Sequence, residues 1–377
     1  MDAGTIKSNL IDFLREEVNP GSSQRDKDQV FSLPLWKQLG SLGLYGICIG
    51  PEHGGHGFDL ITGMSIFETF AHHCEDHGLT FSVAAQLFSC IMPLHKYGTP
   101  EQKGKYLPLL VQGEMIAAHA ISESSSGSDA FNMKSHADWL DGSYILNAEK
   151  KYCTSGIIAD LLFLYAITDP SKGPIGSSSV FILEKNKSQF DPGHLQDKLG
   201  LRTAQMCDIH VRHMAVAPDQ LLGGIGGGFA LFQYAMSWER MGMSIMHLAI
   251  MDRLIDKTIK YLKERKSGMI PLGQYQSIMH LLAGICTELE ATRQLCYHTI
   301  REFQSGKQVY HLASMTKLKS SELFKSVATD LLHLQGAGGI LTPNEYERTM
   351  RDAAASSIYS GTSEVQKNII ASYLKLN

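Results

Sequence analysis

The spacing of apolar residues divides this chain of 377 residues into three parts. Up to about residue 118, apolar side chains recur every three or four positions between Pro and Gly breaks, a pattern that predicts helices. From about 119 to 220, short alternating or β-rich segments bounded by turn residues predict a small β domain. Beyond Gly228, long amphipathic segments with short connections predict a helical bundle.

The expected domains are therefore residues 1–118, 119–224 and 225–377. The glycine-rich run 223–228 is interpreted as a hinge and not as a dinucleotide-binding fingerprint, because Phe229 occupies the place of the third glycine and no βαβ pattern surrounds it. The expected helices are 35–42, 60–71, 81–94, 229–263, 276–305 and 313–334, with one more near the C-terminus, and the expected strands are 144–146, 161–167, 180–183 and 209–216.

Charge and cysteine content narrow the class of protein. A net charge of −4 without basic runs argues against binding to nucleic acid or to anionic lipid. Seven widely spaced cysteines, an odd number, indicate reduced thiols and not a disulfide framework. Apolar runs such as 161–167 are too short to span a bilayer, and the first residues show neither a signal-peptide core nor an Arg-rich transit segment. We therefore expect a cytoplasmic protein that binds neither membranes nor nucleic acid.

One cluster of potential metal ligands, residues 72–77, contains three histidines, one cysteine and two acids. His73 and His77 could share one helix face, but a metal site needs further ligands, and no partner pair with ligand spacing occurs elsewhere. We interpret the cluster as a solvated helix end and predict no metal.

A glycine turn near the C-terminus is the first candidate for chemistry. Gly361 allows a positive φ, and Ser363 with Gln366 forms a capping-box pattern, so a helix is expected to begin at Ser363. The free N–H groups of such a turn suit a phosphate or an enolate oxygen, although an ordinary loop-to-helix junction would have the same pattern. The expected helix has an apolar face, predicted to be buried, made of Val365, Ile369, Tyr373 and Leu376.

Three further stretches carry groups suited to a planar, polar ligand. The hydroxyl-rich run 119–129 offers hydroxyl and N–H groups, but it could equally be a flexible loop. Tyr152 and Thr154 would share one face of a strand, unless they only form a half-buried strand end. Glu239 has apolar helix neighbours, so we expect a largely desolvated carboxylate that is a stronger base. The alternative is an ion pair with another helix; the adjacent Arg240 points to a different face.

Taken together and in order, the motifs resemble the acyl-CoA dehydrogenase superfamily over the whole chain. This resemblance implies a mainly α fold with a β domain, namely an N-terminal helical domain, a middle β-barrel domain and a C-terminal four-helix bundle. The motifs are Ser122-Glu123-x-x-x-Gly127-Ser128-Asp129, Lys150-x-Tyr152-x-Thr154-Ser155-Gly156, Lys198-x-Gly200-x-Arg202, Gln335-Gly336-Ala337-Gly338-Gly339, Arg351-Asp352 and Tyr359-Ser360-Gly361-Thr362-Ser363.

The resemblance implies FAD as cofactor and a homo-oligomer, expected to be a tetramer. A second subunit would contribute to each FAD site through Arg265 and Gln276, while Gly268 replaces the family's phenylalanine and leaves that part of the contact open. The residues that the resemblance assigns to FAD are Ile121, Ser122, Ser128, Tyr152, Thr154, Arg265, Gln276, His333, Gly336, Thr362 and Glu364.

The resemblance also fixes which residue is expected to act as the base. Many family members carry a glutamate directly before Gly-Thr, but this chain has Ser360 there, and a serine hydroxyl cannot remove an α-proton. Other members carry the base on the first long bundle helix, where Glu239 stands. The backbone N–H of Ser360 would then hold the enolate-like oxygen. Substrate contacts are expected from Ser128, Arg240, Tyr359 and Gly361.

A closer resemblance concerns the stretches 86–93, 237–240 and 360–363, which are similar to those of the subgroup that oxidises L-proline held as a thioester on a peptidyl carrier protein. This implies oxidation of an L-prolyl thioester toward pyrrole-2-carboxyl on a carrier protein. Dehydrogenation of a short or branched acyl-CoA is the alternative. A flavin-dependent monooxygenase and a non-enzymatic helical scaffold are further ones.

Overall fold

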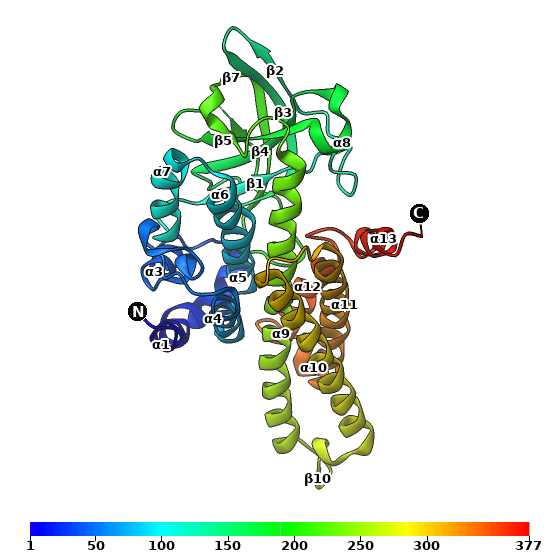
Figure 1. Ribbon diagram of the computed structural model, residues 1–377. Coiled ribbons are helices and arrows are strands. Elements are labelled where there is room, and N and C mark those ends of the chain that lie inside the picture. Colours follow the sequence, from blue (N-terminus) through cyan, green and yellow to red (C-terminus); the bar gives the residue numbers. More distant parts are fainter. Residues whose placement is uncertain (189, 377) are drawn as a thin grey trace.

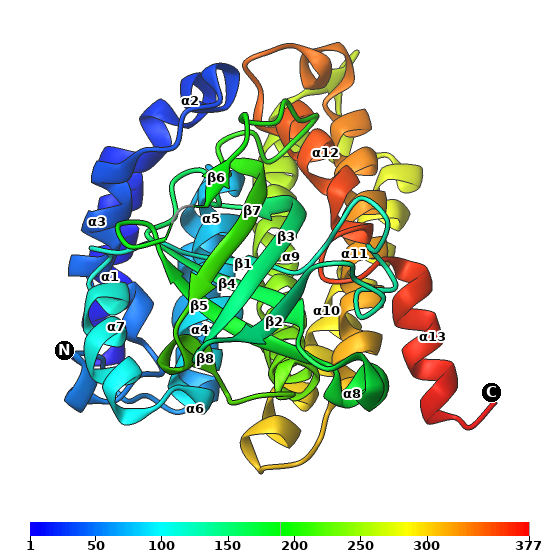
Figure 2. The same cartoon turned by 90° about the horizontal axis from the view of Figure 1, so that it is seen from above.

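The computed structural model describes residues 1–188 and 190–376. It has three parts (Figure 1): a β domain at the top of the view, a group of N-terminal helices beneath and beside it, and a long helical bundle that extends away from the β domain. Figure 2 shows the sheet lying across the N-terminal helices and the first bundle helix. All three parts therefore meet at one junction.

The N-terminal part is helical, as predicted, and its core helix is a nearly continuous rod from His77 to Tyr97. The middle of this rod is a π-helical stretch, η5, a form that recurs at functional sites. The rod is long and apolar enough to cross a membrane, but 94% of its most apolar window is buried inside the chain, which is typical of a core helix of a soluble protein. The elements are α1 (Ala3–Phe13), α2 (Ser22–Asp28), α3 (Leu33–Ser41), α4 (Leu60–His73), α5 (His77–Ala84), η5 (Ala85–Ile91), α6 (Met92–Tyr97) and α7 (Pro100–Val111).

The middle part is an eight-stranded, mostly antiparallel sheet in which β1 pairs in parallel with β4. A register shift between Lys150 and Cys153 interrupts the pairing of β3 with β7, and at this point Tyr152 adopts a φ of 58°. The strands are β1 (Ala117–Ala120), β2 (His136–Leu140), β3 (Ser143–Thr154), β4 (Leu161–Ile167), β5 (Ser178–Glu184), β6 (Asp191–Pro192), β7 (Met206–Val216) and β8 (Leu221–Leu222), and the short helix α8 (Gly173–Gly176) precedes β5.

The C-terminal part is built on α9, a helix of 37 residues that runs from the β domain to the far tip of the bundle. The predicted helices 229–263, 276–305 and 313–334 are confirmed to within three residues. The elements are α9 (Gly228–Glu264), the hairpin β9 (Lys266–Ser267) and β10 (Ile270–Pro271), α10 (Gln276–Gln304), α11 (Tyr310–Leu334), α12 (Glu345–Ala354) and α13 (Ser363–Tyr373).

Two predictions about the C-terminal helix were wrong. The N-cap of α13 is Thr362, whose hydroxyl accepts the N–H of Val365, so the predicted capping box at Ser363 is off by one residue. The predicted buried face is incomplete, since Tyr373 is 57% and Leu376 is 76% exposed. In Figure 1, α13 projects sideways from the bundle. One side of Tyr373 stacks on His311 of α11, with ring centroids 3.6 Å apart, while Leu374 and Leu376 remain exposed.

The prediction of a solvated helix end at residues 72–77 was also wrong, since Cys74, Asp76 and His77 are buried. His77 is buried and its Nδ1 lies 2.9 Å from Asp352 on α12, while its Nε2 lies 2.8 Å from the guanidinium of Arg253 on α9. Asp352 also accepts the N–H of Leu201 from the middle part, at 2.5 Å. Pairing stabilises these buried charges, and the network joins the three parts of the chain at the junction. Within the described ranges, no group of three potential ligands is arranged to hold a metal ion.

Candidate active site

A single carboxylate, Glu239, lies where the three parts meet. Its two oxygens accept hydrogen bonds from two hydroxyls, one from Ser89 on η5 and one from Ser360 in the loop before α13. Glu239 has no ion pair among residues 1–188 and 190–376. The alternative, an ion pair between Glu239 and a basic residue of another helix, is therefore not observed among the described residues.

Glu239 lines a small cavity of about 80 Å³ between the bundle and the β domain. Tyr152 and Thr154 line the same cavity, although the bulge in β3 breaks the strand alternation from which their common face was predicted. The other lining residues are Ala85, Ser89, Cys90, Ala117, Ala118 and His119. A base, an aromatic ring and a hydroxyl thus line one cavity.

Several side chains donate hydrogen bonds to the backbone carbonyls of the turn at Ser360. Lys317 on α11 donates to the carbonyl of Gly361 at 2.7 Å, and Arg240 donates to the carbonyl of Ser360 at 3.3 Å. The amide of Gln366 reaches both carbonyls, at 3.0 and 2.8 Å. These contacts fix Ser360 at a φ of 56°, and its N–H forms no hydrogen bond with the described residues.

Two of the expected substrate-binding residues, Arg240 and Tyr359, form hydrogen bonds within the bundle and the turn and do not line the cavity. The guanidinium of Arg240 is buried, and its second contact is the hydroxyl of Ser314 at 3.3 Å. The hydroxyl of Tyr359 lies 2.6 Å from Nε2 of His247. Burial, together with the charge of Lys317, lowers the pKa of His247 to about 3, so the imidazole is neutral.

The hydroxyl-rich loop is anchored by a buried ion pair. Lys150 lies 2.9 Å from Glu123 and donates to the carbonyl of Ile121 at 3.1 Å. The N–H of Lys151 donates to the carbonyl of Ser122 at 2.8 Å. The side chain of Ser122 is half-buried and that of Ser128 is exposed, so both hydroxyls are accessible beside the anchored backbone.

The other residues expected to bind FAD are outside the cavity at Glu239. Arg265 and Gln276 are exposed at the far tip of the bundle, beside the β9–β10 hairpin (Figure 1). Gly268, in the same hairpin, has a φ of 60° and open space where a Cβ would stand. His333 and Gly336 are exposed at the end of α11, and Thr362 and Glu364 are at the start of α13, where Glu364 is exposed. Within one chain, Arg265 and Gln276 do not meet the rest of the site.

Comparison with known proteins covers the whole chain. Three family models match in succession: the N-terminal domain of acyl-CoA dehydrogenase over residues 2–114, its middle domain over 118–214 and its C-terminal domain over 226–375. The isovaleryl-CoA dehydrogenase of Solanum tuberosum is 31% identical over 367 residues, which are 97% of this chain and 88% of that protein. The chain belongs to the acyl-CoA dehydrogenase superfamily.

Relatives that act on carrier proteins are equally similar. The L-prolyl-[peptidyl-carrier protein] dehydrogenase of Pseudomonas fluorescens is 33% identical over 353 residues, covering 93% of this chain and 92% of that protein. The crystal structure of the prolyl acyl carrier protein oxidase AnaB superposes with a TM-score of 0.95 at 33% identity, covering 99% and 98% of the two chains. The structure of PigA with FAD and proline does so with a TM-score of 0.95 at 29% identity, covering all of both chains.

As a member of this superfamily, the protein is a flavin-dependent oxidoreductase acting on acyl thioesters, and FAD is its cofactor. The residues present fit such a ligand. The hydroxyl of Ser126, in the anchored loop, is buried without a hydrogen-bond partner among the described residues, as is the amide oxygen of Gln366 under the Ser360 turn. Unpaired buried polar atoms at both ends of the site indicate a polar partner that the chain itself does not supply.

Sequence reasoning assigned no role to two residues that the structure brings to the site. Ser89 stood in a stretch similar to the prolyl subgroup, but nothing in the pattern showed that it would face Glu239. Lys317 is a lysine with no exposed surface, between the buried Thr316 and the half-buried Leu318, and a buried lysine has no local sequence signal.

Proposed function

We propose that this protein is an FAD-dependent dehydrogenase of a short acyl or aminoacyl group tethered to a carrier protein, with an L-prolyl thioester as its substrate. The observation that carries the proposal is Glu239, which faces the same small cavity as Tyr152 and Thr154 and is held by two hydroxyls instead of a counter-ion. The similarity to prolyl carrier-protein dehydrogenases and oxidases supports the choice of substrate.

In this proposal Glu239 removes the α-proton of the thioester. Ser89 and Ser360 hold the carboxylate so that an oxygen faces the α-carbon, since both hydroxyls donate to it. The free N–H of Ser360 donates a hydrogen bond to the enolate-like thioester oxygen, an arrangement worth a few kcal/mol in other enzymes. Tyr152 and Thr154 position the flavin ring. When bound, FAD supplies the acceptor for the hydride that leaves the neighbouring carbon, or the nitrogen of proline.

The base is tested by Glu239→Gln, which keeps the size of the side chain but cannot take up the proton. Turnover is expected to fall by about 10²- to 10⁴-fold while FAD stays bound, and the rate of flavin reduction under anaerobic conditions measures this. Retention of more than a tenth of the wild-type rate would show that another group is the base.

The substrate is tested by incubating the enzyme with a prolyl-loaded carrier protein and measuring the mass of the carrier. Conversion of the prolyl ring to a pyrrole removes four hydrogen atoms in two successive two-electron oxidations, with an electron acceptor such as oxygen supplied to reoxidise FAD between them, and the corresponding mass decrease is expected. The second candidate is a dehydrogenase of short or branched acyl-CoA, which the similarity to isovaleryl-CoA dehydrogenase favours. Fast oxidation of isovaleryl-CoA or butyryl-CoA with no change in the prolyl carrier would select it.

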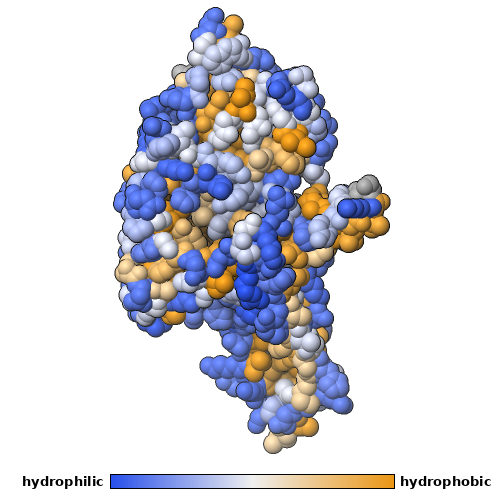
Figure 3. Space-filling model, viewed as in Figure 1, coloured by the Kyte–Doolittle hydropathy of each residue, from blue (hydrophilic) through white to orange (hydrophobic). Residues whose placement is uncertain are grey.

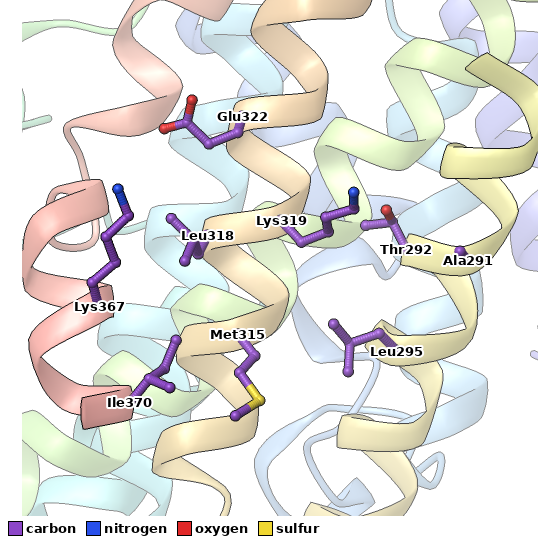
Figure 4. Close-up of a pocket in the computed structure, with 9 residues that line it drawn as sticks. All are labelled: Ala291, Thr292, Leu295, Met315, Leu318, Lys319, Glu322, Lys367 and Ile370. Atoms are coloured by element: carbon purple, nitrogen blue, oxygen red, sulfur yellow. The ribbon is translucent and has the colours of Figure 1, made fainter. Parts of the chain in front are cut away.

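We further propose that the protein is a cytoplasmic homotetramer in which subunits share FAD sites. Arg265 and Gln276 lie at the tip of the bundle, and the outer face of α13 is apolar and exposed. Figure 3 shows apolar surface on the projecting helix α13 and further apolar surface along the lower part of the bundle. A groove of about 570 Å³ between α10, α11 and α13 adds to it (Figure 4); its apolar wall includes Leu295, Met315 and Leu318.

Light scattering on the purified protein tests the assembly. A tetramer with bound FAD is expected, and Arg265→Ala should lower the FAD content without changing the fold of the chain. A monomer that holds a full complement of FAD would contradict the shared site.

A further inference from the structure

A histidine that the proposed chemistry does not use faces the same cavity as Glu239. On β1, Ala118 and Ala120 belong to the core of the β domain, so the alternation of the strand turns His119 to the opposite side, toward the helices. On this side of the strand, His119 is one of the residues that line the cavity, together with Ser89 and Glu239. The imidazole therefore lies on the side of β1 where the acyl group would bind.

His119 is held in place by the neighbouring strand. Its Nε2 lies 2.9 Å from the hydroxyl of Tyr165 on β4, and the two rings meet edge to face with centroids 4.9 Å apart. The ring of Phe232 on α9 lies nearly parallel to the imidazole, with centroids 6.4 Å apart. Tyr165 has no exposed surface, and within the described ranges its hydroxyl has no other partner. The orientation of the ring is therefore fixed before any ligand binds.

The hydrogen bond of the His119 ring within residues 1–188 and 190–376 is made by Nε2, and the second nitrogen, Nδ1, makes none with these residues. Burial, together with the charge of Lys150, lowers the pKa of His119 to about 4, so the ring is neutral at physiological pH. It can form one hydrogen bond through Nδ1, and Tyr165 determines whether this nitrogen donates or accepts.

We propose that His119, held by Tyr165, is a specificity-determining residue whose Nδ1 hydrogen bonds a heteroatom of a short acyl group, such as the ring nitrogen of a prolyl thioester. This inference rests on the proposed function, because it takes the cavity as the place of the acyl group. An all-carbon ring of the same size would leave Nδ1 unpaired once water is excluded. A site built to hydrogen bond its substrate discriminates against analogues that lack the group.

The test compares two loaded carrier proteins, one with a prolyl and one with a cyclopentanecarbonyl thioester. The wild-type enzyme is expected to prefer the prolyl carrier by about 10- to 100-fold in kcat/KM. His119→Leu should reduce this preference to about threefold or less, mainly by slowing the prolyl reaction, with the flavin spectrum and FAD content unchanged. His119→Gln, which keeps a hydrogen-bonding group, should restore part of the preference.

Two further variants define the outcome. Tyr165→Phe frees the imidazole and should weaken the preference less than His119→Leu does. The matched control is His136→Leu, an exposed histidine on β2, which should change nothing. If both His119 variants keep the preference for the prolyl carrier, this inference is overturned but the proposed function is not. The same holds if the variants lose FAD and keep the preference, because His119 would then be a flavin contact. If the wild type oxidises neither carrier, the proposed function is overturned, and this inference with it.

Discussion

Two buried lysines, one in the β domain and one in the bundle, differ in the groups that stabilise their charges. Neither Lys150 nor Lys317 has exposed surface, and burial lowers the pKa of each to about 8, with the charge of Arg240 adding to the effect at Lys317. Lys150 is paired with the carboxylate of Glu123 at 2.9 Å. Lys317 has no carboxylate within 4 Å among the described residues and donates to the carbonyl of Gly361.

This difference in partners indicates that the charge of Lys150 has a structural role and that the charge of Lys317 acts on the candidate active site. The ion pair of Lys150 with Glu123 is local: the carboxylate also accepts the N–H groups of Lys134 and Ser135, so the loop that carries Ser122 is fixed within the β domain. An unpaired buried cation such as Lys317 destabilises the fold, and such costs are retained mainly at functional sites. We therefore expect Lys150 to determine stability and Lys317 to determine activity.

The largest expected effect comes from breaking the pair in the β domain. Glu123→Gln leaves the ammonium of Lys150 buried without a counter-charge, and the free energy of unfolding should fall by about 3–5 kcal/mol in chemical denaturation. The double variant Glu123→Gln with Lys150→Met removes both charges and should recover much of this loss. A decrease below about 1 kcal/mol in the single variant would show that the pair does not fix the loop.

A smaller effect, but on activity, is expected from the lysine of the bundle. Lys317→Met removes the donor to Gly361 and frees the turn that presents Ser360, so kcat should fall by about 10- to 100-fold while the free energy of unfolding changes by about 1 kcal/mol or less. Lys319→Met, at an exposed position on the same helix, is the control and should keep full activity. A large loss of stability without a loss of kcat would make the two lysines equivalent.

The pH dependence sharpens the contrast. The pKa of each lysine in the fold, about 8, lies below its ordinary value of 10.5, so both states hold the proton below pH 8 and the penalty of burial is fully present there. Between pH 8 and 10.5 the unfolded chain binds more protons, and stability should rise. Activity should fall as stability rises, because Lys317 loses its charge. The expected decline in kcat from pH 7 to 9 is severalfold. This decline should persist in the Glu123/Lys150 double variant and be absent in Lys317→Met.

The smallest effect tests whether support from the bundle is enough to orient Glu239. Ser89→Ala removes the hydroxyl that comes from the N-terminal part, and kcat should fall by about 3- to 10-fold, as expected for one hydrogen bond. Ser82→Ala, which removes a buried hydroxyl bonded to the carbonyl of Gly78 one turn away from the site, serves as control. A loss as large as that of Glu239→Gln would assign Ser89 a direct part in the chemistry.

Local patterns predicted the elements well. The continuous apolar run Leu161–Ile167, which is buried on both faces of its strand, and the helical spacing in the three long bundle helices gave boundaries close to those observed. The predictions that were wrong concern ends and partners: Thr362 replaced Ser363 as N-cap, and His77 was expected in solvent but lies beside Asp352. A helix end and a partner 275 residues away are set by packing, which local periodicity does not contain.

By itself, the sequence determined the three parts of the chain, the membership of the superfamily and the choice of Glu239 over Ser360 as candidate base, because these depend on the identity and spacing of residues. Only the tertiary structure decided what surrounds that carboxylate. Ser89 and Ser360 are 150 and 121 residues from Glu239 along the chain, and they reach it because η5, α9 and the turn before α13 pack together. Hydrogen bonds between such distant segments follow from the packing of whole elements, and no short stretch of sequence specifies them.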